Sequence, residues 1–357
     1  MQERFAPIED AIESMRSGKM VVVVDDEDRE NEGDLTIAAQ FATPEAIAFM
    51  AMHGRGLICT ALEGGLLDRL RIPQMVQDNS SPFETAFCVS VEAREGVSTG
   101  ISAHDRARTI AALIDPSSKP SDFVKPGHTF PLRARPGGVL ARTGQTEASV
   151  DLARLAGLHP SGVICEIMKD DGTMARVPDL AVFCQKHGLL MVTVASLVAY
   201  RLKKDPIVRM VESCPKMTQW GQVTVHKFQN TLDKCTYFAF QIGDTAQAGM
   251  PLVRVHLGAL PDDLDGFGSI EGSSFHAAMS AIQKDGCGVL VFLHHRSWDG
   301  SEPVLGPDNR EIGIGAQILG QLGIAKMRLL ARNEKRYSGL KGFGLDIVGT
   351  VPLTPTT

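Results

Sequence analysis

Short apolar runs alternate along the first two hundred residues with segments whose apolar residues recur every three or four positions. A short run of β-branched residues predicts a buried strand, and the wider spacing predicts an amphipathic helix. The predicted strands are 20–24, 35–39, 56–62, 86–92, 162–168 and 189–194, and the predicted helices are 8–16, 44–53, 103–114, 147–156, 178–187 and 195–203. This alternation predicts an α/β (α+β) domain in which helices surround a mixed sheet.

The alternation stops near residues 204–217, where two prolines and a group of charges interrupt it. Beyond this point 223–230, 235–242 and 251–257 have the spacing of strands, and a helix, a strand, a helix and a strand follow. We therefore expect two domains, 1–205 and 206–357, which suits a chain of 357 residues. Within the first domain, 119–142 is rich in Pro, Gly and Arg and is predicted to be a long functional loop.

The composition and charge of the chain argue against several classes of protein. The net charge is −6 and no basic stripe is present, so nucleic acid is not an expected partner. No apolar run approaches the length of a membrane helix, and the first residues do not resemble a signal peptide, so a cytoplasmic protein is expected. The seven cysteines are scattered without CxxC or CxC spacing, which predicts packed, reduced thiols and no thiolate zinc site.

An acidic segment follows the first predicted strand. Arg29 is the single cation there, and the carboxylates are Asp25, Asp26, Glu27, Asp28, Glu30, Glu32 and Asp34. Like charges crowded at the end of a buried strand repel one another, and a hard divalent cation relieves that repulsion. Such a metal would polarise sugar oxygens, while Arg29 would suit a phosphate. A solvated loop is the alternative, and composition alone does not decide between the two.

The segment DDEDRENEGD resembles the signature of the 3,4-dihydroxy-2-butanone 4-phosphate synthase family. The resemblance continues in order through GLICTAL (56–62), STGISAHDR (98–106), KPSDF (119–123), PGHTFPLRARPGG (126–138), RTGQTEASVDLARLAG (142–157), GVICEI (162–167) and DDGTMAR (170–176). It implies conversion of D-ribulose 5-phosphate to L-3,4-dihydroxybutan-2-one 4-phosphate and formate in riboflavin biosynthesis. It also implies Mg²⁺ or Mn²⁺ as cofactor, a sugar phosphate as the small-molecule partner, and a homodimer.

The resemblance assigns roles to residues of this chain. Arg29 and Glu30 are expected to contact the sugar phosphate, Glu30 also to bind the metal, and Asp34 to hold substrate hydroxyls, with Glu32 assisting. The expected phosphate-binding stretch, which precedes a predicted helix, is Arg142, Thr143, Gly144, Gln145 and Thr146.

His128 and Glu166 match the two positions that the family needs for turnover. A lone histidine in a loop is weak evidence by itself, whereas a carboxylate inside the apolar segment GVICEI is rarely buried without a partner or a role. Both can exchange protons near neutral pH. Cys59 lies near the site in the family, and we expect it to be a packed thiol.

Gln145 is a departure from the family pattern R-x-G-H-T-E, which has histidine at this position. An amide oxygen can bind magnesium or manganese, although it is uncharged, and imidazole would suit manganese better. We therefore expect Gln145 to be the second metal ligand and to hold the ion more weakly than histidine would.

The second half resembles GTP cyclohydrolase II, chiefly through DNREIGIGAQILGQLGIAKMRLLARNEKRYSGLKGFGLDIVG (308–349), which implies a second α/β domain of that fold. That enzyme holds zinc with three cysteines in a C-x₁₀-C-x-C arrangement. The corresponding segment 254–272 of this chain contains no cysteine. The glycine-arginine run of the family is not recognisable around 294–301. Ile312 stands where the family has a tyrosine, although the arginine of the family is kept as Arg310. The adjacent pair His294 and His295 would point to opposite faces of a strand.

These differences predict a degenerate, non-catalytic second domain with a structural, dimerising or regulatory role and no zinc. Two alternatives stay open at this point. One is a bifunctional enzyme that also hydrolyses GTP, and the other is a regulatory relic without any activity, which Gln145 would suit.

Overall fold

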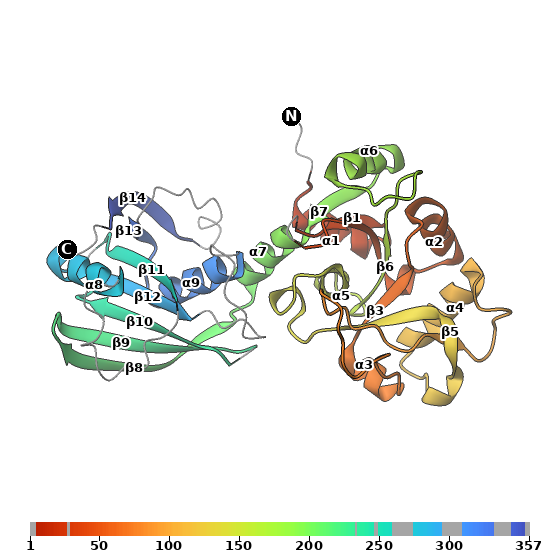
Figure 1. The fold of residues 1–357 in the computed structure, drawn as a ribbon, viewed down its shortest axis with the longest axis horizontal. Coiled ribbons are helices and arrows are strands. Elements are labelled where there is room, and N and C mark those ends of the chain that lie inside the picture. Colours follow the sequence, from red (N-terminus) through yellow and green to blue (C-terminus); the bar gives the residue numbers. More distant parts are fainter. Residues whose placement is uncertain are drawn as a thin grey trace. The chain divides into compact units, whose positions relative to one another are not determined.

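The computed structural model describes residues 5–26, 29–232, 234–245, 249–258, 274–294, 309–331 and 344–353. The chain forms two compact units, Met1–Tyr200 and Arg201–Thr357, each with its own sheet (Figure 1). Among the helices of the described ranges, none has the length and apolar character needed to cross a bilayer.

The first unit is built around a sheet with the strand order β4-β5-β3-β6-β2-β1-β7 in the described part of the chain. Its strands are β1 (Val21–Val24), β2 (Gly33–Ala38), β3 (Cys59–Glu63), β4 (Val91–Ala93), β5 (Phe123–Ala134), β6 (Ser161–Glu166) and β7 (Leu190–Thr193). Its helices are α1 (Ile8–Arg16), α2 (Pro44–Phe49), α3 (Gly64–Arg69), α4 (Ala103–Ile114), α5 (Gln145–Leu155) and α6 (Val177–His187), with shorter helical turns at Ala39–Phe41, Met50–Gly54, Pro120–Asp122 and Gly138–Leu140. Helix α7 (Val194–Lys204) begins in this unit and ends in the second.

The sheet is mixed, because β1 runs parallel to β7, β3 runs parallel to β5, and the other neighbours are antiparallel. The four valines of β1 are buried, as expected for an apolar strand covered on both faces. The predicted α/β fold with a mixed sheet is therefore confirmed.

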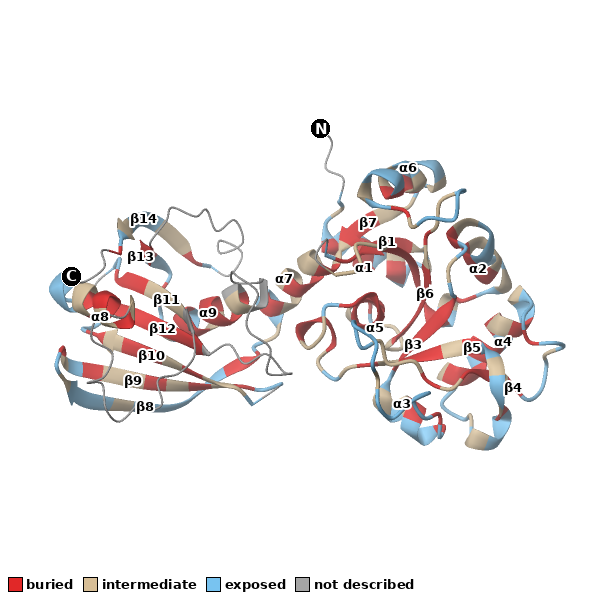
Figure 2. Ribbon diagram, in the orientation of Figure 1, coloured by how far each residue is buried: buried red, intermediate tan, exposed pale blue. Residues whose placement is uncertain are grey.

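Different helices cover the two faces of this sheet (Figure 2). Leu35, Ile37 and Val163 point into a core shared with Ile47 of α2 and Ile110 of α4. Helix α5 covers the opposite face and packs on β6, β2 and β3. Residues that alternate with the core positions, such as Asp34 and Glu166, therefore lie on the α5 face.

The prediction of a long loop at residues 119–142 is wrong, because Phe123–Ala134 forms the twelve-residue strand β5. The Pro and Gly content of the segment misled the prediction, since such residues are uncommon inside strands and a proline such as Pro131 cannot donate to a sheet ladder. The carbonyl of Pro131 accepts a hydrogen bond from Cys88 N, and Cys88 lies outside the regular pairing of β4 with β5. Because the N and the C=O of a strand residue face the same side, the absent N–H of Pro131 faces a part of the sheet where the regular ladder is already interrupted. The predicted strand 86–92 is likewise reduced to Val91–Ala93.

The second unit has the strand order β14-β13-β11-β12-β10-β9-β8 among its described residues. Its strands are β8 (Val208–Thr218), β9 (Gly221–Asn230), β10 (Thr236–Ile242), β11 (Leu252–Gly258), β12 (Gly288–His294), β13 (Lys326–Ala331) and β14 (Asp346–Pro352), and its helices are α8 (Ser274–Asp285) and α9 (Asn309–Gln321). The segment predicted to interrupt the alternation thus supplies a long edge strand, β8.

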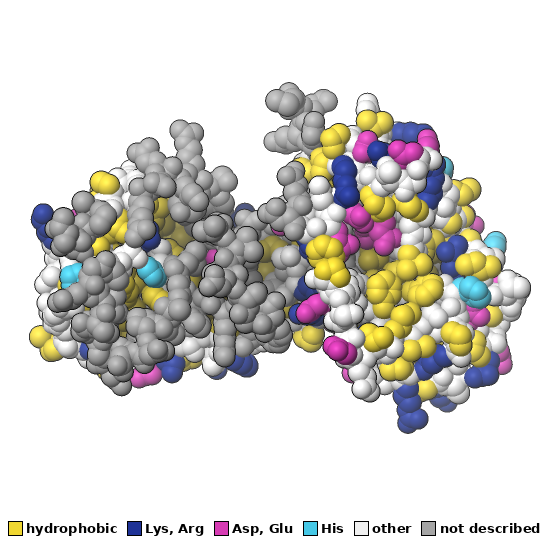
Figure 3. All heavy atoms as spheres, in the orientation of Figure 1, with side chains coloured by type: hydrophobic (Ala, Val, Ile, Leu, Met, Phe, Trp, Pro, Cys, Tyr) yellow, Lys and Arg dark blue, Asp and Glu magenta, His cyan; other side chains and the backbone are white. Residues whose placement is uncertain are grey.

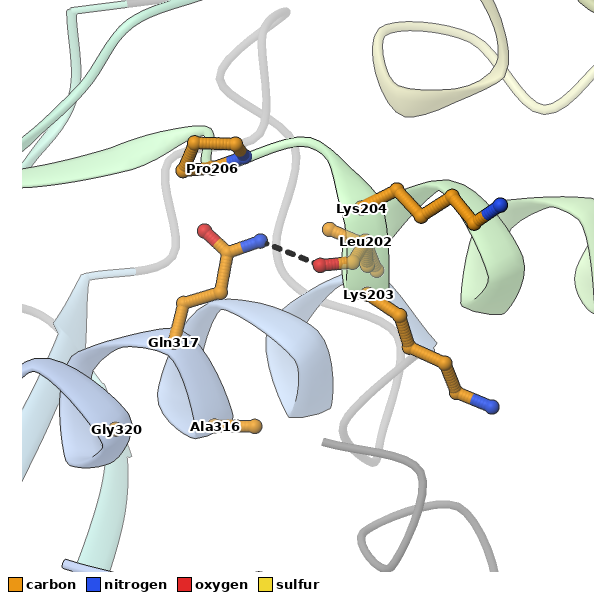
Figure 4. A pocket seen from close by; sticks show the side chains of 7 residues that line it. All are labelled: Leu202, Lys203, Lys204, Pro206, Ala316, Gln317 and Gly320. Carbon is orange, nitrogen blue, oxygen red and sulfur yellow. Dashed lines mark hydrogen bonds between the residues drawn. The ribbon is translucent and has the colours of Figure 1, made fainter. Parts of the chain in front are cut away.

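Two glutamines of α9 bind the start of that edge strand. Gln317 accepts bonds from the backbone N–H groups of Ile207 and Val208 and donates to Leu202 O, at 2.7 Å (Figure 4). Gln321 accepts from Met210 N at 3.1 Å. These bonds satisfy backbone groups that an uncovered edge would expose to pairing with other chains. Beside them lies a small cavity of about 230 Å³.

Several expectations fall outside the described residues: the acidic residues Glu27 and Asp28, most of the segment 254–272, and the residues directly after His294, at 295–308. The side chains of His294, Arg310 and Ile312 are also outside.

Candidate active site

A pair of buried carboxyl groups lies on the α5 face of the first sheet. Asp34 at the start of β2 is directly opposite Glu166 at the end of β6 in the antiparallel register. Opposite residues of such a pair project to the same face, so the two side chains are neighbours. The structure therefore brings together two candidates that are 132 positions apart in the sequence (166 − 34).

Burial raises the pKa of both members of this pair. Burial first, and then the charge of Glu166, raises the pKa of Asp34 well above its ordinary value of 3.8. Burial also raises the pKa of Glu166, although the N–H of Leu57, which donates to Glu166 Oε2 at 2.8 Å, opposes that shift. Asp34 Oδ1 has no donor among the described residues. Burial therefore opposes ionisation more strongly at Asp34 than at Glu166, whose carboxylate keeps a backbone donor.

The acidic segment is organised by Asp25, whose side chain is fully buried. Its Oδ2 accepts from Arg29 Nη1 at 2.6 Å and from Glu30 N at 3.1 Å, and its Oδ1 accepts from Glu32 N at 2.8 Å. The segment is thus an ordered turn around one carboxylate. In Figure 3 acidic side chains gather where β1, β6 and α5 lie, next to apolar ones. The sequence analysis counted Asp25 among the acids but gave it no role.

Arg29 joins the two expected metal ligands. Its Nη2 lies 2.6 Å from Glu30 Oε1, and its Nη1 donates to Gln145 Oε1 at 2.9 Å. One carboxylate and one amide oxygen on a shared cationic group are hard donors of the kind that magnesium accepts. The described residues contain no cluster of three or more His, Cys, Asp or Glu side chains suited to a metal. Both oxygens are bound by Arg29 in this arrangement, and they are the hard donors here that would hold a divalent ion.

The expected phosphate-binding stretch lies at the beginning of α5. Gly144 is the N-cap and no side chain caps this helix, so its first N–H groups suit an anion. Gln145 and Thr146 are buried there, while Thr143 is exposed. Arg142, however, is held by the protein: its Nη1 donates to Glu147 Oε2 at 2.7 Å.

Phe83 is a residue that the sequence analysis missed. Its carbonyl accepts from Arg142 Nη2 at 2.8 Å, and its ring lies 5.3 Å from the guanidinium carbon of Arg29. Both site arginines are therefore oriented by one residue, through a hydrogen bond and a cation–π contact. No periodic pattern marks the segment around Phe83, so the sequence offered no signal for it.

His128 lies toward the same end of the strands as the carboxyl pair, but on a different strand. It belongs to β5, and β3 separates β5 from β6, which corresponds to about 10 Å at ordinary strand spacing. Its Nδ1 is bonded to Glu92. Cys59, on β3 between them, packs with Leu132 and Ile164, which confirms the expected packed thiol, and burial raises its pKa well above the ordinary value.

A buried carboxyl pair, an uncapped helix start, an arginine and two hard oxygen donors are groups suited to one class of enzyme, which moves protons on a phosphorylated, hydroxyl-rich substrate. The sequence profile of the 3,4-dihydroxy-2-butanone 4-phosphate synthase family matches residues 9–200, and the chain belongs to that family. It is a synthase of riboflavin biosynthesis that forms 3,4-dihydroxybutan-2-one 4-phosphate and formate from ribulose 5-phosphate, as predicted.

The second unit matches the GTP cyclohydrolase II family over residues 208–304 and 300–352, so the predicted fusion of these two domains is also confirmed. The chain is similar to riboflavin biosynthesis protein RibBA of Aquifex aeolicus, with 48% identity covering 98% of this chain and 93% of the relative.

Two solved structures are similar. A two-domain 3,4-dihydroxy-2-butanone 4-phosphate synthase, RibBX of A. baumannii, has 39% identity, covers 98% of this chain and 100% of its own, and gives a TM-score of 0.83. A 3,4-dihydroxy-2-butanone 4-phosphate synthase in complex with two magnesium ions has 44% identity and covers 56% of this chain and 98% of its own, with a TM-score of 0.54.

Proposed function

We propose that ribulose 5-phosphate is converted at the Asp34–Glu166 pair. The observation that carries this proposal is the register that places these two buried carboxyls opposite each other. Glu166, ionised, accepts a proton from a substrate carbon, and Asp34, protonated, donates to substrate hydroxyls. His128 exchanges the second proton from the other end of the substrate, a separation that an extended pentulose phosphate spans.

The phosphate and the metal belong to the other side of the site. Arg29 and the first N–H groups of α5, at Gly144, Gln145 and Thr146, bind the phosphate. Glu30 and Gln145 hold the divalent ion, which supplies charge stabilisation to substrate oxygens when it is bound. The relative that was solved in complex with two magnesium ions supports the use of a divalent metal. The manganese alternative, the cytoplasmic location and the homodimer are parts of the same proposal.

Removal of the metal tests the proposal directly. Chelation with EDTA is expected to abolish formate release, and Mg²⁺ to restore it. Gln145→His adds an imidazole ligand and is expected to lower the Mn²⁺ concentration for half-maximal activity by about tenfold. Formate release titrated against each metal measures this, together with the binding of Mn²⁺ followed by electron paramagnetic resonance.

A matched control is Gln40→His, at a glutamine of the first unit that has no contact with Glu30 among the described residues. It should leave both titrations unchanged. Identical metal curves for the native protein and the Gln145 variant would remove Gln145 from the ligand set, and full activity in EDTA would remove the metal from the reaction.

We further propose that residues 206–357 are a degenerate, non-catalytic GTP cyclohydrolase II domain. The absence of cysteine between residues 254 and 272 supports this, because a thiolate zinc site needs such ligands. The full-length similarity to a two-domain protein whose name gives only the synthase activity also supports it.

The bifunctional alternative is tested by incubating the purified protein with GTP and Zn²⁺ in the absence of any pentulose. Neither formate nor pyrophosphate is expected above the level of a zinc-only control. Sustained turnover of GTP would show that the second domain is catalytic.

A further inference from the structure

A break in the pairing of β4 with β5 surrounds His128. Val91 pairs with Thr129, but the next residue, Glu92, pairs with Val124. Residues 125–128 of β5 therefore have no partner on β4 and form a local excursion from the ladder. Irregularities of this kind re-aim a side chain, and they are common beside active sites.

Two glycines allow the chain to pack closely against β4 at this excursion. A Cβ on Gly127 would lie 2.2 Å from the carbonyl carbon of Val91, and Gly127 N donates to Ser90 Oγ at 3.2 Å. Gly100 has φ +90°, and a Cβ there would lie 1.4 Å from Glu92 Oε1. Both glycines belong to motifs of the family, 98–106 and 126–138. A larger residue at either position would displace the backbone or the side chain of this part of β4.

Between these glycines, Glu92 Oε1 and His128 Nδ1 form a hydrogen bond. The side chain of Glu92 is 14% exposed and that of His128 is 49% exposed, so the carboxylate is the more buried partner and the outer part of the imidazole is accessible. We propose that Glu92 is a positioning residue that holds His128 in one orientation and one tautomer. The proposal rests on the proposed role of His128 in proton transfer.

The chemistry follows from the two nitrogens of the ring. A carboxylate accepts hydrogen bonds and cannot donate when ionised, so the proton of neutral His128 resides on Nδ1. Nε2 is then the nitrogen that takes a proton from the substrate and returns it. The charge of Glu92 stabilises the imidazolium formed in between, as a carboxylate does for histidine in other acid–base sites.

Glu92→Gln keeps the shape of the side chain and removes its charge. It is expected to lower kcat by about 10- to 100-fold and to leave KM for ribulose 5-phosphate within about twofold, because the residue acts on proton transfer and not on binding. Glu95→Gln, three positions along the same segment, is the control and should retain native kinetics.

A double-mutant cycle separates this role from a structural one. In a His128→Asn background, Glu92→Gln is expected to cause no further loss, since its effect passes through the ring. An independent loss in that background would overturn the proposal, as would native kcat in Glu92→Gln alone. Native turnover in His128→Asn would instead overturn the proposed role of His128.

The tautomer gives a readout that does not depend on activity. In ¹⁵N-histidine-labelled protein, the His128 signals, identified by their absence in His128→Asn, should show the proton on Nδ1. Glu92→Leu removes the acceptor and is expected to shift the population toward Nε2–H, with thermal unfolding showing that the variant is folded. Unchanged His128 signals in that variant would overturn the positioning role.

Discussion

Glu166→Gln is expected to lower the rate of formate release from ribulose 5-phosphate by about 1,000-fold. In the proposed mechanism Glu166 is the ionised member of the buried pair, because Leu57 N stabilises its carboxylate while Asp34 Oδ1 has no donor among the described residues. The amide of the variant keeps the size of the side chain but cannot accept a proton. The loss should therefore appear in kcat while the substrate still binds.

The measurement is a coupled formate assay at saturating Mg²⁺. Glu63→Gln is a suitable control, since Glu63 also ends a strand, β3, but forms a half-exposed ion pair with Arg154. This control should retain native rates. A Glu166 variant with more than about a tenth of native kcat would show that the general base is another group.

Asp34→Asn is expected to lower activity by about 100-fold and to stabilise the fold at neutral pH. A buried carboxyl whose Oδ1 has no donor among the described residues is costly to ionise, and its removal is expected to raise the free energy of unfolding by about 1–3 kcal/mol. Activity and stability should thus change in opposite directions at one residue, which is typical of a functional group held in an unfavourable environment.

The pH dependence of this stabilisation follows from the raised pKa. Between the ordinary value of 3.8 and the higher value in the folded protein, the folded state binds a proton that the unfolded state has released. Stability from Asp34 is therefore present at acid pH and is lost as the pH rises. The gain from Asp34→Asn should be small near pH 4 and grow toward pH 8, as measured by urea unfolding. A gain that is independent of pH would contradict this assignment of the proton.

The sequence predicted the chemistry of the site better than its geometry. The run of carboxylates and the apolar setting of Glu166 marked candidate groups without any knowledge of the fold, and the resemblance to the family implied their roles. Their proximity could not be predicted, because it depends on the register of β2 against β6, which the packing of the whole sheet decides.

The residues that the sequence missed all act through their position in the fold. Phe83 lies in an irregular segment and contacts two arginines far from it in the chain. Glu92 is one of many acidic residues until the excursion of β5 brings His128 to it. Asp25 was visible as a carboxylate, but its part in shaping the turn comes from three bonds to backbone and side chain that composition does not encode.

The pairing of Asp34 with Glu166 limits how this protein can evolve. Substitutions in β2 and β6 that stay apolar leave the two carboxyls where they are. A one-residue insertion or deletion within either strand would instead turn one carboxyl to the opposite face. Homologues that keep the activity should therefore vary in the identity of these strand residues but not in their number, whereas surface loops away from the site are free to change in length.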